Sequence, residues 1–173
     1  PFLTVPQVAS GDGFTVALQI NGTVLTWGDN DRGQLGSGSG DAYNVTPTAI
    51  SFPFDDPNTY IRKIAAGKDH ALALDSTGTV WAWGCNINGR LGLGENSGIE
   101  MATSPKKLTF KMDPTDVDEL TVSRIAVGAS FSLALTTDGK VFVWGDNVNG
   151  QLGFEPVNDG IDNYRWLESP TNL

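Results

Sequence analysis

Apolar and polar residues alternate with a period of two in three stretches of the chain, which is the pattern of a β-strand with one buried face. In the first stretch, Phe14, Val16 and Leu18 alternate with Thr15 and Ala17. The residues that hold the same apolar positions in the other two stretches are His70, Leu72 and Leu74, and Phe131, Leu133 and Leu135. We therefore expect a strand in each stretch.

A turn signal ends each alternating stretch, because glycine supplies the positive φ that a tight hairpin needs. The three dipeptides are Asn21-Gly22, Thr77-Gly78 and Asp138-Gly139. The strand expected after each turn is apolar on both faces, which is typical of a sheet that packs between two neighbours. A later Pro-x-x-Ile or Pro-x-x-Leu run predicts one more short strand, with proline at its start; these runs are 47–50, 105–108 and 170–173. No segment combines helical periodicity with caps, so the predicted fold class is all-β.

These elements belong to an internal repeat, because residues 8–36, 64–92 and 125–153 align without a gap. The shared pattern is Gly-x-x-[His/Phe], then Leu, Gly-x-Val, and Trp-Gly-x-Asn-x-x-Gly-[Gln/Arg]-Leu-Gly. Its middle instance is Gly67, His70, Leu74, Gly78, Val80, Trp83, Gly84, Asn86, Gly89, Leu91 and Gly92. The pattern resembles the repeat of the regulator of chromosome condensation family. Tryptophan followed by glycine, at this spacing, argues against the WD and kelch repeats.

The resemblance implies a β-propeller, a closed ring of normally seven four-stranded blades. Three repeats supply three blades, so we expect residues 1–173 to form a single partial propeller domain, an arc of the ring. The expected repeats are 1–46, 47–104 and 105–169, with 170–173 starting the next blade. Because an arc leaves apolar blade faces uncovered, we expect the remaining blades to come from the same longer chain or from another chain.

The charge and composition of the chain limit the classes of partner and the compartments that we expect. The formal net charge is −9 and the pI is about 4.3, which argues against direct contact with nucleic acid and is compatible with a basic protein partner. No run of 18 apolar residues is present, so we expect no membrane span. The single cysteine, Cys85, excludes an internal disulfide framework and favours a reducing, intracellular compartment, cytoplasmic or nuclear.

The sequence contains few of the residue types and motifs that catalysis or metal binding requires. With one histidine, His70, and one cysteine, the chain lacks the ligands of a usual zinc site and shows no nucleophile motif. We expect no enzyme activity, metal or cofactor. The repeated Asn30, Asn86 and Asn147 are expected to bond to nearby backbone and shape their turn. The repeated Trp27, Trp83 and Trp144 are expected to be packing anchors between blades.

We therefore predict a non-catalytic protein–protein interaction platform or scaffold, part of a larger protein or assembly, whose contacts with a partner come from its loops. The family resemblance places the Gly-x-x-His position near one face of the ring, where it can contact a partner. The predicted contacts on that face are Asp12, Phe14, Lys68, Asp69, His70, Ser130 and Phe131. The loop contacts predicted in addition are Arg32, Asn88, Tyr164, Arg165 and Trp166; the last three have hot-spot composition. The linkers 51–59 and 111–120 are expected to be solvated insertions.

Two other functions stay open at this point. Guanine-nucleotide exchange on a small GTPase is the activity of the family's founding member, although two of the three Gly-x-x-His positions hold phenylalanine here. A secreted bacterial inhibitor or surface-binding propeller is the other, since similar propellers include a β-lactamase inhibitor.

Overall fold

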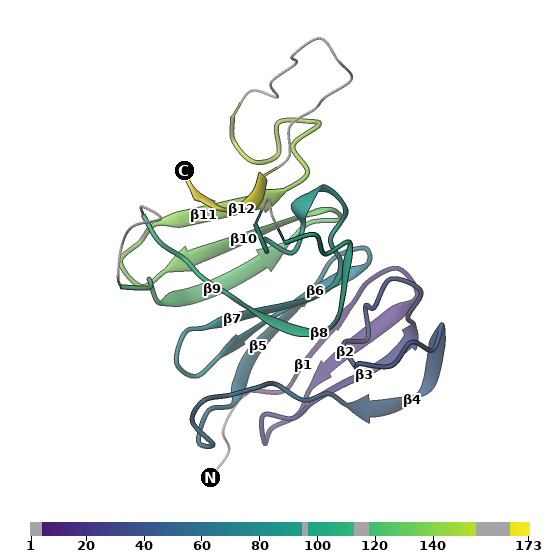
Figure 1. The fold of residues 1–173 in the computed structure, drawn as a ribbon. Helices are drawn as coiled ribbons and strands as arrows, with labels where there is room; N and C mark the ends of the chain where they lie inside the picture. The colour runs from purple at the N-terminus through teal and green to yellow at the C-terminus, as the bar shows by residue number, and fades with distance from the viewer. Residues whose placement is uncertain (1–4, 95–96, 113–117, 155–166) are drawn as a thin grey trace.

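Three four-stranded antiparallel sheets follow one another along the chain (Figure 1). The computed structural model describes residues 5–94, 97–112, 118–154 and 167–173. Blade 1 contains β1 (Gln7–Ser10), β2 (Phe14–Leu18), β3 (Val24–Asp29) and β4 (Tyr43–Ala49). Blade 2 contains β5 (Ile61–Ala66), β6 (His70–Asp75), β7 (Val80–Cys85) and β8 (Met101–Leu108). Blade 3 contains β9 (Val122–Val127), β10 (Phe131–Thr136), β11 (Val141–Gly145) and β12 (Leu167–Asn172). Apart from a 3₁₀ turn at Ile87–Gly89, the described residues form no helix, and the predicted all-β class is confirmed.

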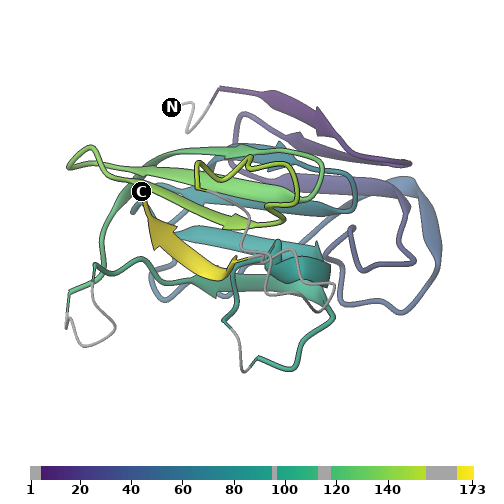
Figure 2. The same cartoon turned by 90° about the horizontal axis from the view of Figure 1, so that it is seen from above.

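The blades lie beside one another in chain order (Figure 2). Within each sheet the strands pair in the order of the sequence, so every connection joins neighbours. Between sheets, β5 of blade 2 contacts β1 and β2 of blade 1 on one side and β9 of blade 3 on the other. The first and second strands of blades 1 and 2 therefore both contact the first strand of the next blade.

The Pro-x-x-Ile and Pro-x-x-Leu runs form the fourth strand of a blade. β4 contains Pro47 and pairs with β3, and β8 contains Pro105 and pairs with β7. The segment 170–172 lies in β12 and pairs with β11. The repeat boundaries expected after residues 46, 104 and 169 thus fall inside these outer strands, and each sheet ends a few residues later.

The predicted hairpins join the second and third strands of every blade. Their turn glycines, Gly22, Gly78 and Gly139, have φ values of 86°, 91° and 89°. A residue with a β-carbon rarely adopts this conformation. The turns keep Leu18 opposite Val24, Leu74 opposite Val80 and Leu135 opposite Val141.

The apolar residues of the alternating stretches fill the spaces between blades. Phe14, Val16 and Leu18 are buried in one core cluster with Ala71 and Ala73 of blade 2. Leu72 and Leu74 are buried in a second cluster with Ala134 and Phe142 of blade 3. One face of β6 in the middle blade therefore packs against blade 3, and the other face packs against blade 1.

Aromatic residues that follow the fourth strands of blades 1 and 2 pack on the next blade. Phe52 and Phe54 stack with ring centroids 5.6 Å apart, and both meet the ring of Trp81 edge to face. Directly before the second linker, Phe110 makes edge-to-face contacts with Phe142 and Trp144. The expectation of a solvated insertion was therefore wrong for the start of the first linker.

Candidate functional site

Three loops, one from each blade, lie side by side along one edge of the arc. They are residues 11–13, 67–69 and 128–130, each between the first and second strands of its blade. The amide of Asp12 donates to the carbonyl of Lys68 (2.7 Å), and the amide of Lys68 donates to the carbonyl of Ala129 (3.0 Å). We call these loops the loop row. Because backbone hydrogen bonds link them, the row displays its side chains from a continuous, fixed support.

The first residue of each loop is a glycine because the neighbouring backbone approaches too closely for a side chain. A β-carbon on Gly11 would lie 2.3 Å from the carbonyl oxygen of Gly67, and one on Gly67 would lie 2.6 Å from that of Gly128. The same added atoms would lie 2.1 Å from the ring of Phe14 and 2.2 Å from the ring of His70. The repeated glycine therefore makes the row possible.

The structure separates the predicted contacts of this face into two groups. Asp12 and Lys68 are exposed, and Asp69 and Ser130 are half-buried in the loop row. Phe14 and His70 are only 2% and 0% exposed and lie beneath the row in the core between blades. Phe131 is half-buried at the same repeat position in blade 3. Phe14 and His70 thus hold the row from below, and their side chains do not reach its surface.

The predicted loop contacts Arg32 and Asn88 lie in equivalent turns after β3 and β7. Arg32 is exposed, and Asn88 is half-buried with a φ of 60°. Tyr164, Arg165 and Trp166 lie outside the described residues.

The repeated asparagine shapes these turns as predicted. Its side-chain oxygen accepts the amide of the leucine five residues later, at 3.1 Å for Asn30, 3.0 Å for Asn86 and 2.9 Å for Asn147. Its side-chain amide donates to a carbonyl further along the loop, for example from Asn30 to Asp41 at 2.7 Å. The prediction of a backbone-bonding asparagine is confirmed.

Blade 2 contains an ion pair that the sequence analysis did not single out. Arg90 Nη1 lies 2.5 Å from Asp69 Oδ1, and both side chains are largely buried. At the same repeat positions blade 1 has Gln34 and Gly13, and Gln34 bonds instead to Asp29. Cys85 replaces that aspartate in blade 2. The carboxylate has therefore moved from the third strand to the loop row, a change visible only when the three repeats are compared position by position.

His70 is neutral and held by blade 3. Its Nε2 lies 3.0 Å from Ser132 Oγ, and Ser132 donates its own hydroxyl hydrogen to the carbonyl of Arg90 (3.0 Å). Nε2 must therefore carry the ring proton. Nδ1 is buried, and among the described residues nothing hydrogen-bonds to it. Burial first, and the charge of Arg90 second, lower the pKa of His70 to about 4.

Cys85 is equally enclosed. Its side chain is 1% exposed, and burial raises the pKa of its thiol. A raised pKa disfavours the reactive thiolate.

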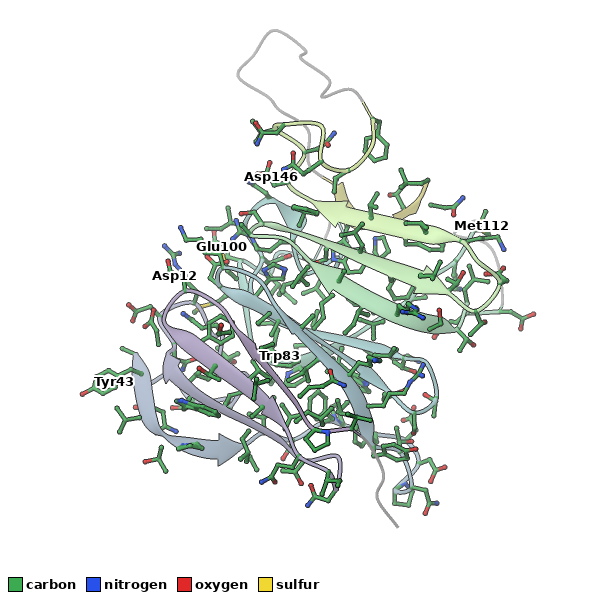
Figure 3. The ribbon with its side chains drawn as sticks, turned by 180° about the vertical axis from the view of Figure 1, so that it is seen from behind. Asp12, Tyr43, Trp83, Glu100, Met112 and Asp146 are labelled. Carbon is green, nitrogen blue, oxygen red and sulfur yellow. The ribbon has the colours of Figure 1, made fainter. Side chains whose placement is uncertain are left out.

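Carboxylates collect at the edge of the arc that carries the loop row. Figure 3 shows Asp12, Glu100 and Asp146 along this edge, with Met112 at the opposite one. Asp31 and Asp41 are also exposed on the turn after β3, where the amide of Asp29 bonds to the carbonyl of Gly13 in the loop row. The cations at this edge are Arg32, Lys68 and the paired Arg90. We call this edge the acidic edge.

A groove of about 500 Å³ lies between β8 and β12, and no residue of the loop row lines it. Within the described ranges, no three His, Cys, Asp or Glu side chains are placed to hold a metal ion. No helix in that part of the chain has the length and apolarity to cross a membrane.

Radially arranged four-stranded sheets joined through tryptophan and glycine define the chain as part of a β-propeller. The chain belongs to the regulator of chromosome condensation (RCC1) repeat family. One model of this repeat matches residues 6–34, 61–90 and 122–151, and a second matches residues 21–74, 77–135 and 138–172.

Similar curated proteins are much longer than this chain. The human probable E3 ubiquitin-protein ligase HERC6 is 36% identical over 147 residues, which are 85% of this chain and 13% of HERC6. The bovine secretion-regulating guanine nucleotide exchange factor is 38% identical over 154 residues, which are 86% of this chain and 31% of that protein. The chain thus spans less than a third of either relative.

Solved structures share the fold. Prp20p from Saccharomyces cerevisiae, whose structure was described together with its binding to Gsp1p and histones, aligns with a TM-score of 0.78 and 26% identity. The alignment covers 96% of this chain and 37% of Prp20p. Human WBSCR16 aligns with a TM-score of 0.76 and 28% identity, over 96% of this chain and 39% of that protein.

Proposed function

We propose that this part of the propeller is a protein-binding platform whose contact surface is the acidic edge. The observation that carries the proposal is the loop row, in which hydrogen bonds from Asp12 to Lys68 and from Lys68 to Ala129 join three blades. A surface that is already ordered loses little conformational entropy when a partner binds. The support is rigid, while the residues that it displays differ from blade to blade.

The charge of this edge supports a basic partner. Asp12, Asp31, Asp41 and Glu100 are exposed there, against the exposed cations Arg32 and Lys68. Complementary charge increases the rate of association and selects among partners. It also disfavours the phosphate backbone of nucleic acids. The partners of Prp20p named above include histones, which supports a protein partner of this kind for the present chain.

A binding measurement with a lysine-rich synthetic peptide tests the proposal. The protein that carries this chain is titrated into the fluorescently labelled peptide, and anisotropy is followed at several salt concentrations. Replacing two exposed carboxylates of the acidic edge (Asp12→Asn with Asp31→Asn) should weaken binding about twofold or more, since each exposed charge contact contributes about 0.2–1 kcal/mol. The salt dependence should fall as well.

The chain offers a matched control at the other end of the blades. Asp55→Asn with Asp118→Asn changes the net charge equally, and both side chains are exposed in the linkers. This variant should bind the peptide as the unchanged protein does. Equal weakening by the two pairs would mean that only the net charge matters, and would reject the acidic edge as a specific surface.

Guanine-nucleotide exchange is a second candidate, supported by the 38% identity to the bovine exchange factor. A propeller performs exchange by remodelling the nucleotide site of the GTPase, so it needs a fixed contact surface and no catalytic group of its own. The release of labelled GDP from a panel of small GTPases tests this function. No acceleration at saturating protein would eliminate exchange for those GTPases and leave the binding platform in place.

A further inference from the structure

The two blade-to-blade interfaces share one set of contacts. The indole of Trp83 donates to the carbonyl of Gln34 (2.9 Å), and the indole of Trp144 donates to the carbonyl of Arg90 (3.1 Å). Each indole also packs on a glycine of the preceding blade, Gly36 or Gly92, where a β-carbon would lie within 3 Å of the ring. Because these contacts repeat, they cannot distinguish one neighbouring blade from another.

One pair of positions beneath the loop row does differ between the interfaces. At the first interface the pair is Phe14 and Ala71, which are both buried in one apolar cluster. At the second interface the same repeat positions hold His70 and Ser132, which hydrogen-bond at 3.0 Å. One interface is therefore apolar at this point and the other is polar.

Mixing the two kinds of partner would be costly. His70 opposite an alanine would lose its bond at Nε2, and its Nδ1 already has no hydrogen-bond partner among the described residues. A buried polar group without a partner loses the hydration that it had in water and gains nothing in exchange. Ser132 is placed to accept from the ring because its own hydrogen is directed to the carbonyl of Arg90.

We propose that His70 and Ser132 are a matched pair that specifies blade 3 as the neighbour of blade 2. Blade 2, with His70 at this position, requires a neighbour that offers a hydroxyl oxygen as hydrogen-bond acceptor. Blade 1, with Phe14 at this position, requires a neighbour that offers a small apolar side chain. Repeats with similar faces need such differences if the blades are to assemble in a single order. The inference concerns the blade interfaces and does not rest on the proposed binding function.

A double-mutant cycle at the second interface measures the pairing in the protein that carries this chain. The variants are Ser132→Ala, His70→Phe and the two together, and the readout is the unfolding equilibrium in urea. Ser132→Ala should raise the unfolded fraction about tenfold or more, and His70→Phe added to it should restore most of the loss, because the pair then matches the first interface. Additive effects would overturn the proposal.

Introducing the histidine and serine at the first interface gives a second test, which does not depend on whether the variants of the second interface fold. Phe14→His alone should destabilise the protein, and Ala71→Ser added to it should recover stability, since the carbonyl of Gln34 lies where that of Arg90 does in the second interface. Ser130→Ala, a neighbouring hydroxyl outside the pair, serves as the control and should change little. If Ala71→Ser gives no recovery, the two positions are not a matched pair.

Discussion

Glycine at the start of each loop of the row lets the backbones of adjacent blades pass within hydrogen-bonding distance. At Gly67 an added β-carbon would meet a backbone carbonyl on one side and the ring of His70 on the other. Neither neighbour can move away freely, because the carbonyl is part of the next loop and the ring lies in the core. The glycine is thus the residue on which the contact surface depends.

Gly67→Ala should accordingly destabilise the protein by about 3 kcal/mol, the upper end of the usual cost of overpacking. The midpoint of urea unfolding measures the loss. Gly40→Ala is the matched control, because a β-carbon on Gly40 would meet nothing within 4 Å, and it should leave the midpoint within experimental error. A tolerated Gly67→Ala would show that the loops can separate without loss.

A second residue-scale prediction follows from the neutral state of His70. Its pKa is lowered from 6.5 to about 4 in the folded protein, so below pH 6.5 the unfolded chain binds a proton that the folded protein excludes. Stability is therefore complete above pH 6.5 and falls as the pH drops toward 4, by about 3 kcal/mol in total. The free energy of unfolding, measured across this pH range, should depend less steeply on pH in His70→Phe. An unchanged pH dependence would exclude His70 as its source.

The same residue shows how far the sequence pattern reached. His70 begins a run in which Leu72 and Leu74 alternate with alanine, and a period of two places all three on the same, buried face of the strand. Its burial was therefore implicit in the pattern, although the family resemblance suggested a contact role. Its partner Ser132 is 62 residues away, and no local pattern could have indicated that bond.

At the scale of elements, the aromatic residues that follow the fourth strands of blades 1 and 2 pack against the next blade. Phe52 and Phe54 lie against the tryptophans of blade 2, and Phe110 lies against the aromatic residues of blade 3. Phe52 and Phe110 hold the same place after the fourth strands, two residues after Ile50 and Leu108. Two residues later the blades differ: Phe54 is packed against Trp81, whereas its counterpart Met112 is 49% exposed.

Phe52→Ala should cost about 3 kcal/mol of stability, since it removes a ring that meets three other aromatic rings. Met112→Ala, an apolar truncation in the corresponding part of the second linker, should cost about 0.5 kcal/mol or less. Thermal unfolding of the two variants side by side measures the difference. Equal losses would indicate that the aromatic contacts add nothing specific.

The limits of the blades illustrate what a repeat can and cannot reveal. The repeat aligns equally well wherever its start is placed, so periodicity alone leaves the division into sheets undecided. The pairing of Pro47 and its strand with β3 decides it, and this pairing depends on backbone hydrogen bonds between segments about 20 residues apart in sequence. The number of blades and their strands were predictable, whereas their boundaries required the structure.

At the scale of the whole molecule, the first blade of the arc differs from the middle blade in what covers it. Val8 in β1 is 81% exposed, whereas Ile64 at the same repeat position in β5 is 9% exposed. The difference arises because blade 1 covers Ile64, and no sheet among the described residues covers Val8. The solved relatives, of which this chain matches 37–39%, continue beyond the matched part.

The hydrogen bonds of the loop row also give the arc a direction. In both hydrogen bonds of the row, the backbone amide of one blade donates to a backbone carbonyl of the following blade. The row therefore begins with the carbonyl of Asp12 and ends with the amide of Ala129, and within the described residues neither group has a backbone partner. Units with one donor end and one acceptor end join head to tail and cannot pair symmetrically through these ends. The rotation from blade to blade then determines whether such a series closes into a ring or continues as an open helical filament.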